Sequence, residues 1–368
     1  MMSTLSEFGW DDRWAALFAE HERAGLVPAR VSIEYNHIFR VVTESGELQA
    51  QHSGRLLHRA EGRHELAAVG DWVAVRPSEG EKTGTIEEIL PRRSRFSRKV
   101  AGELTEEQVV AANIDTVFLV MGLDRDYNPR RLERYLLMAY ESGASPVVLL
   151  SKADLSTDLP ARVAAITVLA PGTPVHAISS VARTAEDGTV EPPDMSAVVQ
   201  HLGVGRTGAL LGSSGVGKST LINAIAGTDR LKTAAVRESD SRGRHTTRHR
   251  QLIVLPGQGL LIDTPGMREL QLWDLSEAAR DAFDDIEVLA ADCHFTDCRH
   301  RDEPRCAVKT AVAEGRLDAD RLASYLKLQD EARALDARKD VRAQIDDKRR
   351  AKVMGRAQKQ LYKDRGRE

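Results

Sequence analysis

The chain has 368 residues, of which 42% are hydrophobic and 29% charged, a balance typical of a soluble globular protein with two or three domains. No stretch approaches the roughly 20 uninterrupted apolar residues of a membrane span. The N-terminus also lacks the basic segment and apolar core of a secretory signal, so we expect a cytoplasmic protein with no membrane partner. The formal net charge of -3 conceals a basic tail, because residues 338–368 carry 12 Lys or Arg against 5 Asp or Glu.

Residues 1–104 are predicted to form a helix followed by a small β-barrel. The spacing of apolar residues predicts a short amphipathic helix from about Trp10 to Ala24. Alternating or apolar runs separated by turn residues then predict strands at residues 30–42, 48–58, 69–75 and 85–90. Four or five strands in roughly 70 residues are typical of a small barrel.

From about Thr105 the pattern changes to alternating strands and helices. Apolar runs predict strands at residues 115–121, 146–150, 175–178, 207–211, 252–255 and 260–262, and helices at 130–142 and 160–169. This alternation indicates a mostly parallel sheet with helices on both faces. From about Leu275 the pattern is helical, is interrupted by three cysteines, and ends in a charged helical tail that starts near Asp318.

A glycine-rich segment with the phosphate-loop pattern Gly-x-x-x-x-Gly-Lys-Ser lies between the apolar run at 207–211 and a helix-like run that ends at Ala226. In that context the backbone N–H groups surround phosphates, the lysine neutralises the β and γ oxygens, and the serine is a magnesium ligand. The predicted phosphate-binding residues are Gly212, Ser213, Ser214, Gly215, Val216, Gly217, Lys218, Ser219 and Thr220.

A second nucleotide element, Asp263-Thr264-Pro265-Gly266, follows the apolar run at 260–262. A carboxylate at the end of a strand can hold magnesium, usually through water, and a glycine amide can reach the γ-phosphate. We therefore predict that Asp263 is a magnesium ligand and that Gly266 contacts the γ-phosphate.

The element that selects the base is Ser151-Lys152-Ala153-Asp154, which is similar to the Asn-Lys-x-Asp guanine motif. The Asp154 carboxylate can accept hydrogen bonds from guanine N1–H and from its exocyclic amine, whereas adenine presents an acceptor at N1. Lys152 is expected along the base and ribose, and Ser179 and Ser180 form the short loop that supports the base. Because Ser151 replaces the asparagine, we expect retained specificity with some loss of affinity.

The order of these elements differs from that of ordinary GTPases, in which the guanine motif follows the phosphate loop and Asp-x-x-Gly. Here the guanine motif begins 61 residues before Gly212. A parallel sheet whose termini are neighbours can be cut and rejoined without losing a site at its strand ends. The sequence therefore predicts a circularly permuted GTPase.

The three cysteines lie within fourteen residues, which in a cytosolic chain points to metal rather than to disulfides. Cys293, Cys298, His300 and Cys306 would form a closed tetrahedral zinc site of structural type. His294 is the competing imidazole. The alternative is that the three thiols pack as small hydrophobic groups.

Several further segments resemble the ribosome small-subunit-dependent GTPase A family, over about residues 29–330. The most specific are Gly243-Arg244-His245-Thr246-Thr247 and Leu272-Trp273-Asp274-Leu275, on either side of Asp263. Val69-Gly70-Asp71 and Ile89-Leu90-Pro91-Arg92 are also similar to that family. The resemblance implies a multidomain α/β protein with an OB-fold β-barrel, a circularly permuted P-loop GTPase domain and a C-terminal helical zinc-binding domain.

On this basis we expect an N-terminal helical extension at residues 1–28, an OB-fold domain at 29–104, the permuted GTPase domain at 105–274, a zinc-binding helical domain at 275–335 and a basic helical tail at 336–368. The resemblance also implies GTP hydrolysis late in the assembly of the small ribosomal subunit, with that subunit's rRNA and proteins as partners. The expected cofactors are Mg²⁺ with GTP and one structural Zn²⁺. We expect a monomer.

The predicted catalytic residues are Lys218, Thr247 and His245. Thr247 is favoured as the switch residue that reaches magnesium and the γ-phosphate, with Thr246 as the alternative. Met267 stands where many GTPases place a water-orienting glutamine, so slow hydrolysis by the isolated protein is expected. His245 is a candidate for positioning that water because imidazole is an effective base near neutral pH, and a binding or structural role for it stays open.

Three basic clusters are candidates for RNA contact, at residues 92–99, 242–250 and 348–350. The barrel can add stacking surfaces such as Phe96 or Trp72, although Trp72 fits a core position better. Two other functions stay open, a nucleotide-gated RNA-binding scaffold and a permuted GTPase that acts on another ribosomal or RNA particle. A third, an ATPase or small-molecule kinase, predicts that ATP competes as well as GTP.

Overall fold

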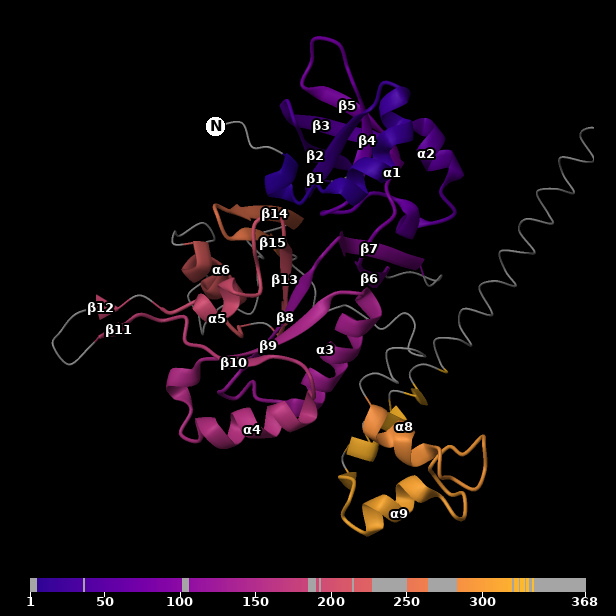
Figure 1. Cartoon of the computed structure of the whole chain (residues 1–368), viewed down its shortest axis with the longest axis vertical. Coiled ribbons are helices and arrows are strands. Elements are labelled where there is room, and N and C mark those ends of the chain that lie inside the picture. The colour runs from indigo at the N-terminus through magenta and orange to yellow at the C-terminus, as the bar shows by residue number, and fades with distance from the viewer. Residues whose placement is uncertain are drawn as a thin grey trace, which may run out of the picture. The chain divides into compact units, whose positions relative to one another are not determined.

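The computed structural model describes residues 5–35, 37–100, 106–184, 190–191, 193–213, 215–226, 250–263, 283–319, 321–323, 325–327, 329–330 and 333. The chain divides into two compact units (Figure 1). The first comprises Met1–Arg98 with Glu107–Leu272, and the second comprises Lys99–Glu106 with Trp273–Glu368.

Five strands of the first unit close into a barrel. They are β1 (Val27–Tyr35), β2 (Ile38–Thr43), β3 (Gly46–His52), β4 (Trp72–Pro77) and β5 (Thr83–Ile89). The pairing order β1-β2-β3-β5-β4 returns to β1, so the barrel has no free edge. Its interior is filled by buried apolar side chains, among them Val31, Phe39, Val41, Val73, Val75 and Ile86. The predicted N-terminal OB-type barrel is confirmed.

Two strand predictions within this barrel are wrong. Residues 30–42, expected as one strand, form the β1–β2 hairpin, which turns at His37 with a φ of 71°. Residues 48–58, also expected as one strand, contain β3 and then the helix α2 (Gly54–Arg59). Ser53 explains the change, because its Oγ accepts a hydrogen bond from the Leu56 N–H at 3.1 Å and so caps the helix N-terminus.

The predicted N-terminal helix is α1 (Asp12–Arg23), which follows the 3-10 turn η1 (Leu5–Phe8). Asp11 caps it by accepting a hydrogen bond from the Trp14 N–H at 3.1 Å. Trp10 and Trp14 pack against Trp72 of β4, with ring centroids 4.8 and 6.1 Å apart. These aromatic contacts bury one face of α1 against the barrel.

Six strands form the sheet that follows. They are β8 (Thr116–Gly122), β9 (Ser145–Ser151), β10 (Val175–Ala177), β13 (Thr207–Gly212), β14 (Arg250–Leu255) and β15 (Gly259–Asp263). Their spatial order is β10-β9-β8-β13-β15-β14, and every neighbouring pair is parallel except β14 with β15. The predicted mostly parallel sheet is confirmed.

Helices cover both faces of this sheet. They are α3 (Pro129–Ser142), α4 (Leu159–Leu169), α5 (Ser196–Val199) and α6 (Lys218–Ala226). Phe118 and Val120 of β8 pack in one core cluster with Leu221 and Ile222 of α6. The β8 side chains that alternate with Phe118 and Val120 point to the opposite face of the sheet. Figure 1 shows α3 on that side of the strand.

The barrel and the sheet are hydrogen-bonded to each other through β1 and β14. Ile33 lies opposite Gln251 and Glu34 opposite Arg250 in an antiparallel pair. Arg250 Nη1 and Glu34 Oε2 also form a partly buried ion pair at 2.8 Å. Backbone pairing between neighbouring strands is therefore continuous from the barrel to the sheet.

A buried arginine strengthens this junction. Arg30 of β1 is 2% exposed and donates hydrogen bonds to the carbonyl oxygens of Gly70 and Asn113 and to the hydroxyl of Thr207, at 3.2, 3.1 and 2.9 Å. Its guanidinium also lies over the Trp72 ring, 5.3 Å from the centroid. Because Thr207 begins β13, Arg30 ties the barrel to the strand that carries the glycine-rich loop.

Two further sheets have two strands each: β6 (Arg95–Val100) with β7 (Glu106–Ala112), and β11 (Arg183–Thr184) antiparallel to β12 (Val190–Glu191). The second unit contains α8 (Asp284–Ala290) and α9 (Ala307–Ala313). Phe283 and Tyr325 pack edge to face there at 5.4 Å. No helix within the described ranges is long and apolar enough to cross a membrane.

Candidate nucleotide-binding site

Five parallel strands end at one edge of the sheet and bring the predicted motifs together. The glycine-rich loop follows β13, Asp263 ends β15, Ser151 ends β9 with Lys152–Asp154 directly after it, and Ser179 and Ser180 follow β10. The carboxyl ends of the strands in an open parallel sheet are where such folds bind ligands. Chain order does not matter for this convergence, since strand order alone decides which ends are neighbours.

The glycine-rich loop lies at the N-terminus of α6. Gly215 and Gly217 have φ values of 73° and 102°, a left-handed backbone that glycine adopts without strain. Lys218 Nζ donates hydrogen bonds to the backbone oxygens of Gly212 and Ser213, at 2.7 and 2.6 Å. The loop therefore wraps around the lysine ammonium, beside helix N–H groups that attract anions.

The guanine-type motif contacts this loop directly. Ser151 is buried, and its Oγ donates a hydrogen bond to the Val216 carbonyl oxygen at 2.9 Å. Lys152 has a left-handed φ of 59°, and its Nζ donates to the Gly215 carbonyl oxygen at 3.1 Å. Two consecutive residues of one motif thus contact two consecutive residues of the other, although 63 to 65 residues separate the partners in the chain.

Asp154 stands on the 3-10 turn η3 (Ala153–Leu155), with its side chain exposed. Ser179 Oγ donates a hydrogen bond to Asp154 Oδ1 at 2.7 Å, and the Ala153 N–H donates to the Ile178 carbonyl oxygen at 3.1 Å. The loops after β9 and β10 are therefore fixed to each other. The Asp154 carboxylate is oriented by one hydroxyl and has acceptor capacity left for a ligand.

Asp263 and Lys218 influence each other across the same edge. Burial raises the pKa of Asp263, and the nearby positive charge of Lys218 opposes that effect, with a net upward shift. A carboxylate that is costly to ionise in the protein gains from a divalent cation beside it, because the cation favours the charged form. Ser219 and Thr220, at the start of α6, are exposed toward solvent.

Several predicted residues lie outside the part of the chain that the structure describes. These include Ser214 of the glycine-rich loop and, in the segment after Asp263, Gly266 and Met267. His245, Thr246 and Thr247 also fall in that group.

Two residues of this edge belong to no predicted motif. Asp124 and Asp126 lie between β8 and α3, and they contact Lys152 Nζ at 2.6 Å and Ser213 Oγ at 2.5 Å, respectively. The available signal was their position, since acidic residues directly after an apolar run also occur at Asp263. Asp263 belongs to a known nucleotide motif, whereas no known motif surrounds Asp124 or Asp126, so the sequence did not predict a role for these two.

The cysteine cluster of the second unit could hold a metal ion. The candidate ligand atoms of Cys293, Cys298, His300 and Cys306 all lie within 4.8 Å of one another. Cys293 Sγ and Cys306 Sγ are 3.8 Å apart, and His300 Nδ1 is 3.6 and 3.4 Å from these two sulfurs. Tetrahedral zinc with ~2.3 Å Zn–S and ~2.1 Å Zn–N bonds requires separations of about 3.8 Å and 3.6 Å. The donor set therefore fits zinc.

Two residues of the first basic cluster, Arg92 and Phe96, are held within the fold. Arg92 binds the buried Asp71 carboxylate through two hydrogen bonds of 2.8 Å. Phe96 is 2% exposed, so the prediction that it offers a stacking surface to RNA is wrong, whereas Trp72 is a core residue as expected. The clusters at residues 242–249 and 348–350 lie outside the described ranges.

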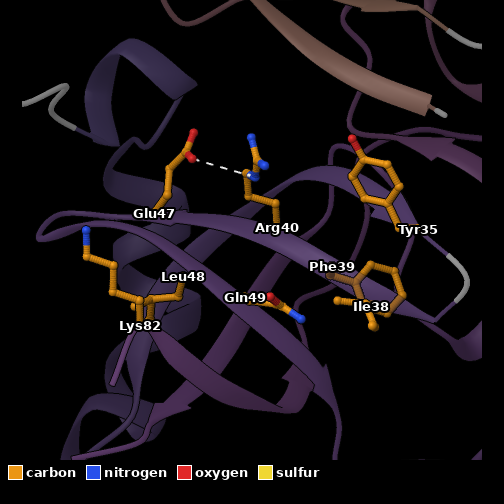
Figure 2. Close-up of a pocket in the computed structure, with 8 residues that line it drawn as sticks. All are labelled: Tyr35, Ile38, Phe39, Arg40, Glu47, Leu48, Gln49 and Lys82. Atoms are coloured by element: carbon orange, nitrogen blue, oxygen red, sulfur yellow. Dashed lines mark ion pairs between the residues drawn. The ribbon is translucent and has the colours of Figure 1, made fainter. Parts of the chain in front are cut away.

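A groove of about 560 Å³ lies on the barrel wall, away from these motifs (Figure 2). It is lined by Tyr35, Ile38, Phe39, Arg40, Glu47, Leu48, Gln49 and Lys82. Arg40 and Glu47 form an exposed ion pair at 3.7 Å across β2 and β3. The groove holds no residue of a nucleotide motif.

Residues 89–273 match the model of the RsgA GTPase family. Two relatives, both named small ribosomal subunit biogenesis GTPase RsgA, come from Opitutus terrae and Xanthomonas axonopodis pv. citri. Each is 46% identical to this chain; the matches cover 89% of this chain and 89% and 88% of the two relatives.

Two solved structures share the fold. YjeQ from Thermotoga maritima is 24% identical, with a TM-score of 0.59 over 83% of this chain and 98% of its own. YloQ, described as a circularly permuted GTPase, is 22% identical, with a TM-score of 0.57 over 84% of this chain and 96% of its own.

Proposed function

This chain belongs to the RsgA GTPase family and is a GTP hydrolase, and from that premise we propose that it binds one GTP with Mg²⁺ where β8, β9, β10, β13 and β15 end. We propose further that its partner is the small ribosomal subunit, that it acts late in the assembly of that subunit, and that the subunit stimulates hydrolysis. The names of the two relatives support this partner. The chain acts as a monomer in the cytoplasm.

The observation that carries the proposed site is the contact between the two motifs. Ser151 and Lys152 donate to the carbonyl oxygens of Val216 and Gly215. A guanine held by the first motif therefore lies next to a phosphate chain held by the second. This adjacency is what a single nucleotide requires.

Each motif has a distinct role in the proposal. Asp154 accepts hydrogen bonds from guanine N1–H and the exocyclic amine, and Ser179 keeps its carboxylate oriented. Lys218 exchanges its backbone acceptors for the β- and γ-phosphate oxygens. Ser219 and Asp263 would hold the magnesium ion, which would supply positive charge to offset that of the phosphates.

The catalytic assignment uses residues beyond the described ranges. Thr247 is proposed to reach magnesium and the γ-phosphate, and His245 to position the attacking water. Met267 follows the Asp-Thr-Pro-Gly element and has no group that can orient water. We therefore expect the small subunit to complete the catalytic site, which would explain how it stimulates hydrolysis.

Zinc is proposed as the metal of the second unit. Three thiolates and one imidazole leave no ligand position for substrate, so the ion is structural. When bound, it crosslinks the segment between α8 and α9, and the binding energy becomes folding energy.

The barrel groove is proposed as one rRNA-contacting surface. Arg40 and Lys82 together outweigh the charge of Glu47, which pairs with Arg40, and Tyr35 supplies an aromatic ring that is 37% exposed. Basic groups neutralise phosphates, and aromatic rings stack with bases. The residues of this groove replace Phe96, which is buried, as the candidates for stacking.

The test is GTP turnover with and without purified small ribosomal subunits. We expect the subunit to raise the rate by about tenfold or more, since completing a GTPase site in trans has a large effect. Purified large subunits and the Lys218→Ala variant serve as controls, and both should give the unstimulated rate or less. Unchanged turnover with small subunits would refute the partner as an activator, and nucleotide-dependent binding without faster turnover would favour an RNA-binding scaffold.

A further inference from the structure

The loop from Leu123 to Asn128, which joins β8 to α3, contacts both nucleotide motifs through two aspartates. We propose that Asp124 and Asp126 are positioning residues: Asp124 orients the guanine motif and thereby sets base selectivity, and Asp126 fixes the phosphate loop for any nucleotide. This inference rests on the proposed function of the same site.

Asp124 acts through Lys152. Lys152 Nζ donates at 2.6 Å to Asp124 Oδ2 and at 3.1 Å to the Gly215 carbonyl oxygen, so one ammonium joins three loops. Although burial opposes it, the hydrogen bond from Lys152 holds the pKa of Asp124 below its ordinary value. The carboxylate is therefore charged at neutral pH and pairs with a charged lysine.

Lys152 needs such support because of its backbone. Its φ of 59° is in the left-handed region, which disfavours residues other than glycine. Asp154 follows two residues later on η3. A side chain anchored at both Asp124 and Gly215 holds this turn in the conformation that presents Asp154, and it limits the rotamer freedom that binding would otherwise have to remove.

Asp126 acts on the phosphate side. Its Oδ1 accepts hydrogen bonds from Ser213 Oγ at 2.5 Å and from Arg131 Nη2 at 2.7 Å, and its Oδ2 accepts from the Gly122 N–H at 3.2 Å. Arg131 belongs to α3, so Asp126 connects the phosphate loop to a helix on the sheet. Arg131 also offsets the negative charge that the carboxylate brings near the phosphates.

The two aspartates form one unit, because the Asp126 N–H donates to Asp124 Oδ1 at 3.1 Å. Their effects on ligands should nevertheless separate. Asp154 is used only by guanine, so loosening its turn weakens guanine nucleotides alone. Ser213 lies in the loop that binds phosphates, and every nucleoside diphosphate uses that loop.

The experiment measures the affinities of GDP and ADP by displacement of a fluorescent GDP analogue from the full-length chain. The Asp124–Lys152 pair is partly exposed, so for Asp124→Asn we expect GDP to bind about fivefold more weakly with ADP unchanged. For Asp126→Asn we expect both affinities to fall by the same factor, leaving the GDP-to-ADP ratio at its wild-type value.

Asp158→Asn is the matched control. Asp158 is exposed, lies four residues after Asp154, and makes no side-chain cap hydrogen bond to α4. Its replacement removes the same charge near the motif, and we expect both affinities to stay within about twofold of wild type. Urea unfolding midpoints of all variants separate a binding effect from loss of the fold.

Two results would overturn the inference. One is an Asp124→Asn variant whose GDP-to-ADP ratio equals that of Asp158→Asn, and the other is an Asp126→Asn variant that loses GDP binding alone. If the wild-type chain itself binds no guanine nucleotide, the proposed function fails, which is a different result from either.

Discussion

Replacing Asp154 with asparagine should change the preferred base from guanine to xanthine. The substitution alters one exposed side chain, and an asparagine oxygen can still accept the Ser179 hydroxyl hydrogen bond, so the fold should not change. Guanine would lose its acceptor for the exocyclic amine and face an amide N–H instead. Xanthine has a carbonyl at that position and would accept a hydrogen bond from the amide.

The magnitude follows from the number of hydrogen bonds affected. Guanine donates two hydrogen bonds to the Asp154 carboxylate, and each hydrogen bond to a charged group contributes about 1.5 to 3 kcal/mol. The carboxylate is exposed before the ligand binds. The lower end is therefore appropriate. The bond to the exocyclic amine is lost and the bond from N1–H loses its charged acceptor, so a total of about 2 kcal/mol, or roughly thirtyfold weaker binding of GDP, is expected.

Displacement of a fluorescent nucleotide gives the affinities of GDP, XDP and ADP for the wild type, Asp154→Asn and the control Asp158→Asn. The expected result is weaker GDP and stronger XDP binding in Asp154→Asn, with the control unchanged. If Asp154→Asn kept the wild-type affinity for GDP, Asp154 would not read the base, and an ATPase or kinase would regain support. Equal loss of GDP and XDP would indicate damage to the loop instead.

The remaining predictions concern single groups. Ser151→Ala removes the buried hydrogen bond to Val216, and GDP binding should weaken about fivefold, a loss of ~1 kcal/mol; unchanged affinity would mean that this contact does not shape the site. Burial lowers the pKa of His52 to about 4, and its Nε2 accepts a backbone hydrogen bond at 3.0 Å. The imidazole thus stays neutral in the fold but protonates in the unfolded chain below about pH 6.5, so the free energy of unfolding should fall by about 1 kcal/mol from pH 7 to pH 5, after allowance for partial exposure. Urea titrations followed by tryptophan fluorescence test this, and His52→Gln should flatten the dependence. Cys306→Ser should abolish binding of one zinc ion per chain, measured by elemental analysis, while GDP still binds; normal zinc content would exclude Cys306 as a ligand.

Motifs whose function depends on residues that are close together in the sequence could be predicted. The glycines and Lys218 act through their spacing at the junction of a strand and a helix, and the structure has β13 and α6 at that junction. The permuted order was also predictable, because strand ends meet at one edge of a parallel sheet whatever their order in the chain.

Features that depend on which distant residues meet could not be predicted. Asp124 and Lys152 are 28 residues apart, and Arg30 and Thr207 are 177 apart, so only the sheet order brings them together. Phe96 looked available for RNA because basic residues surround it in sequence, yet it is buried. The helix that begins after Ser53 was predicted as part of a strand, because a single capping hydroxyl can outweigh the strand propensity of the residues around it.

A crystal structure of the full-length chain with GDP and Mg²⁺ tests the central claim most directly. We expect one nucleotide, with its guanine edge on the Asp154 carboxylate, its β-phosphate within hydrogen-bond distance of Lys218 Nζ, and magnesium on the side of Asp263. A nucleotide bound to the glycine-rich loop with its base away from Asp154 would contradict the claim that the permuted motifs form one guanine site.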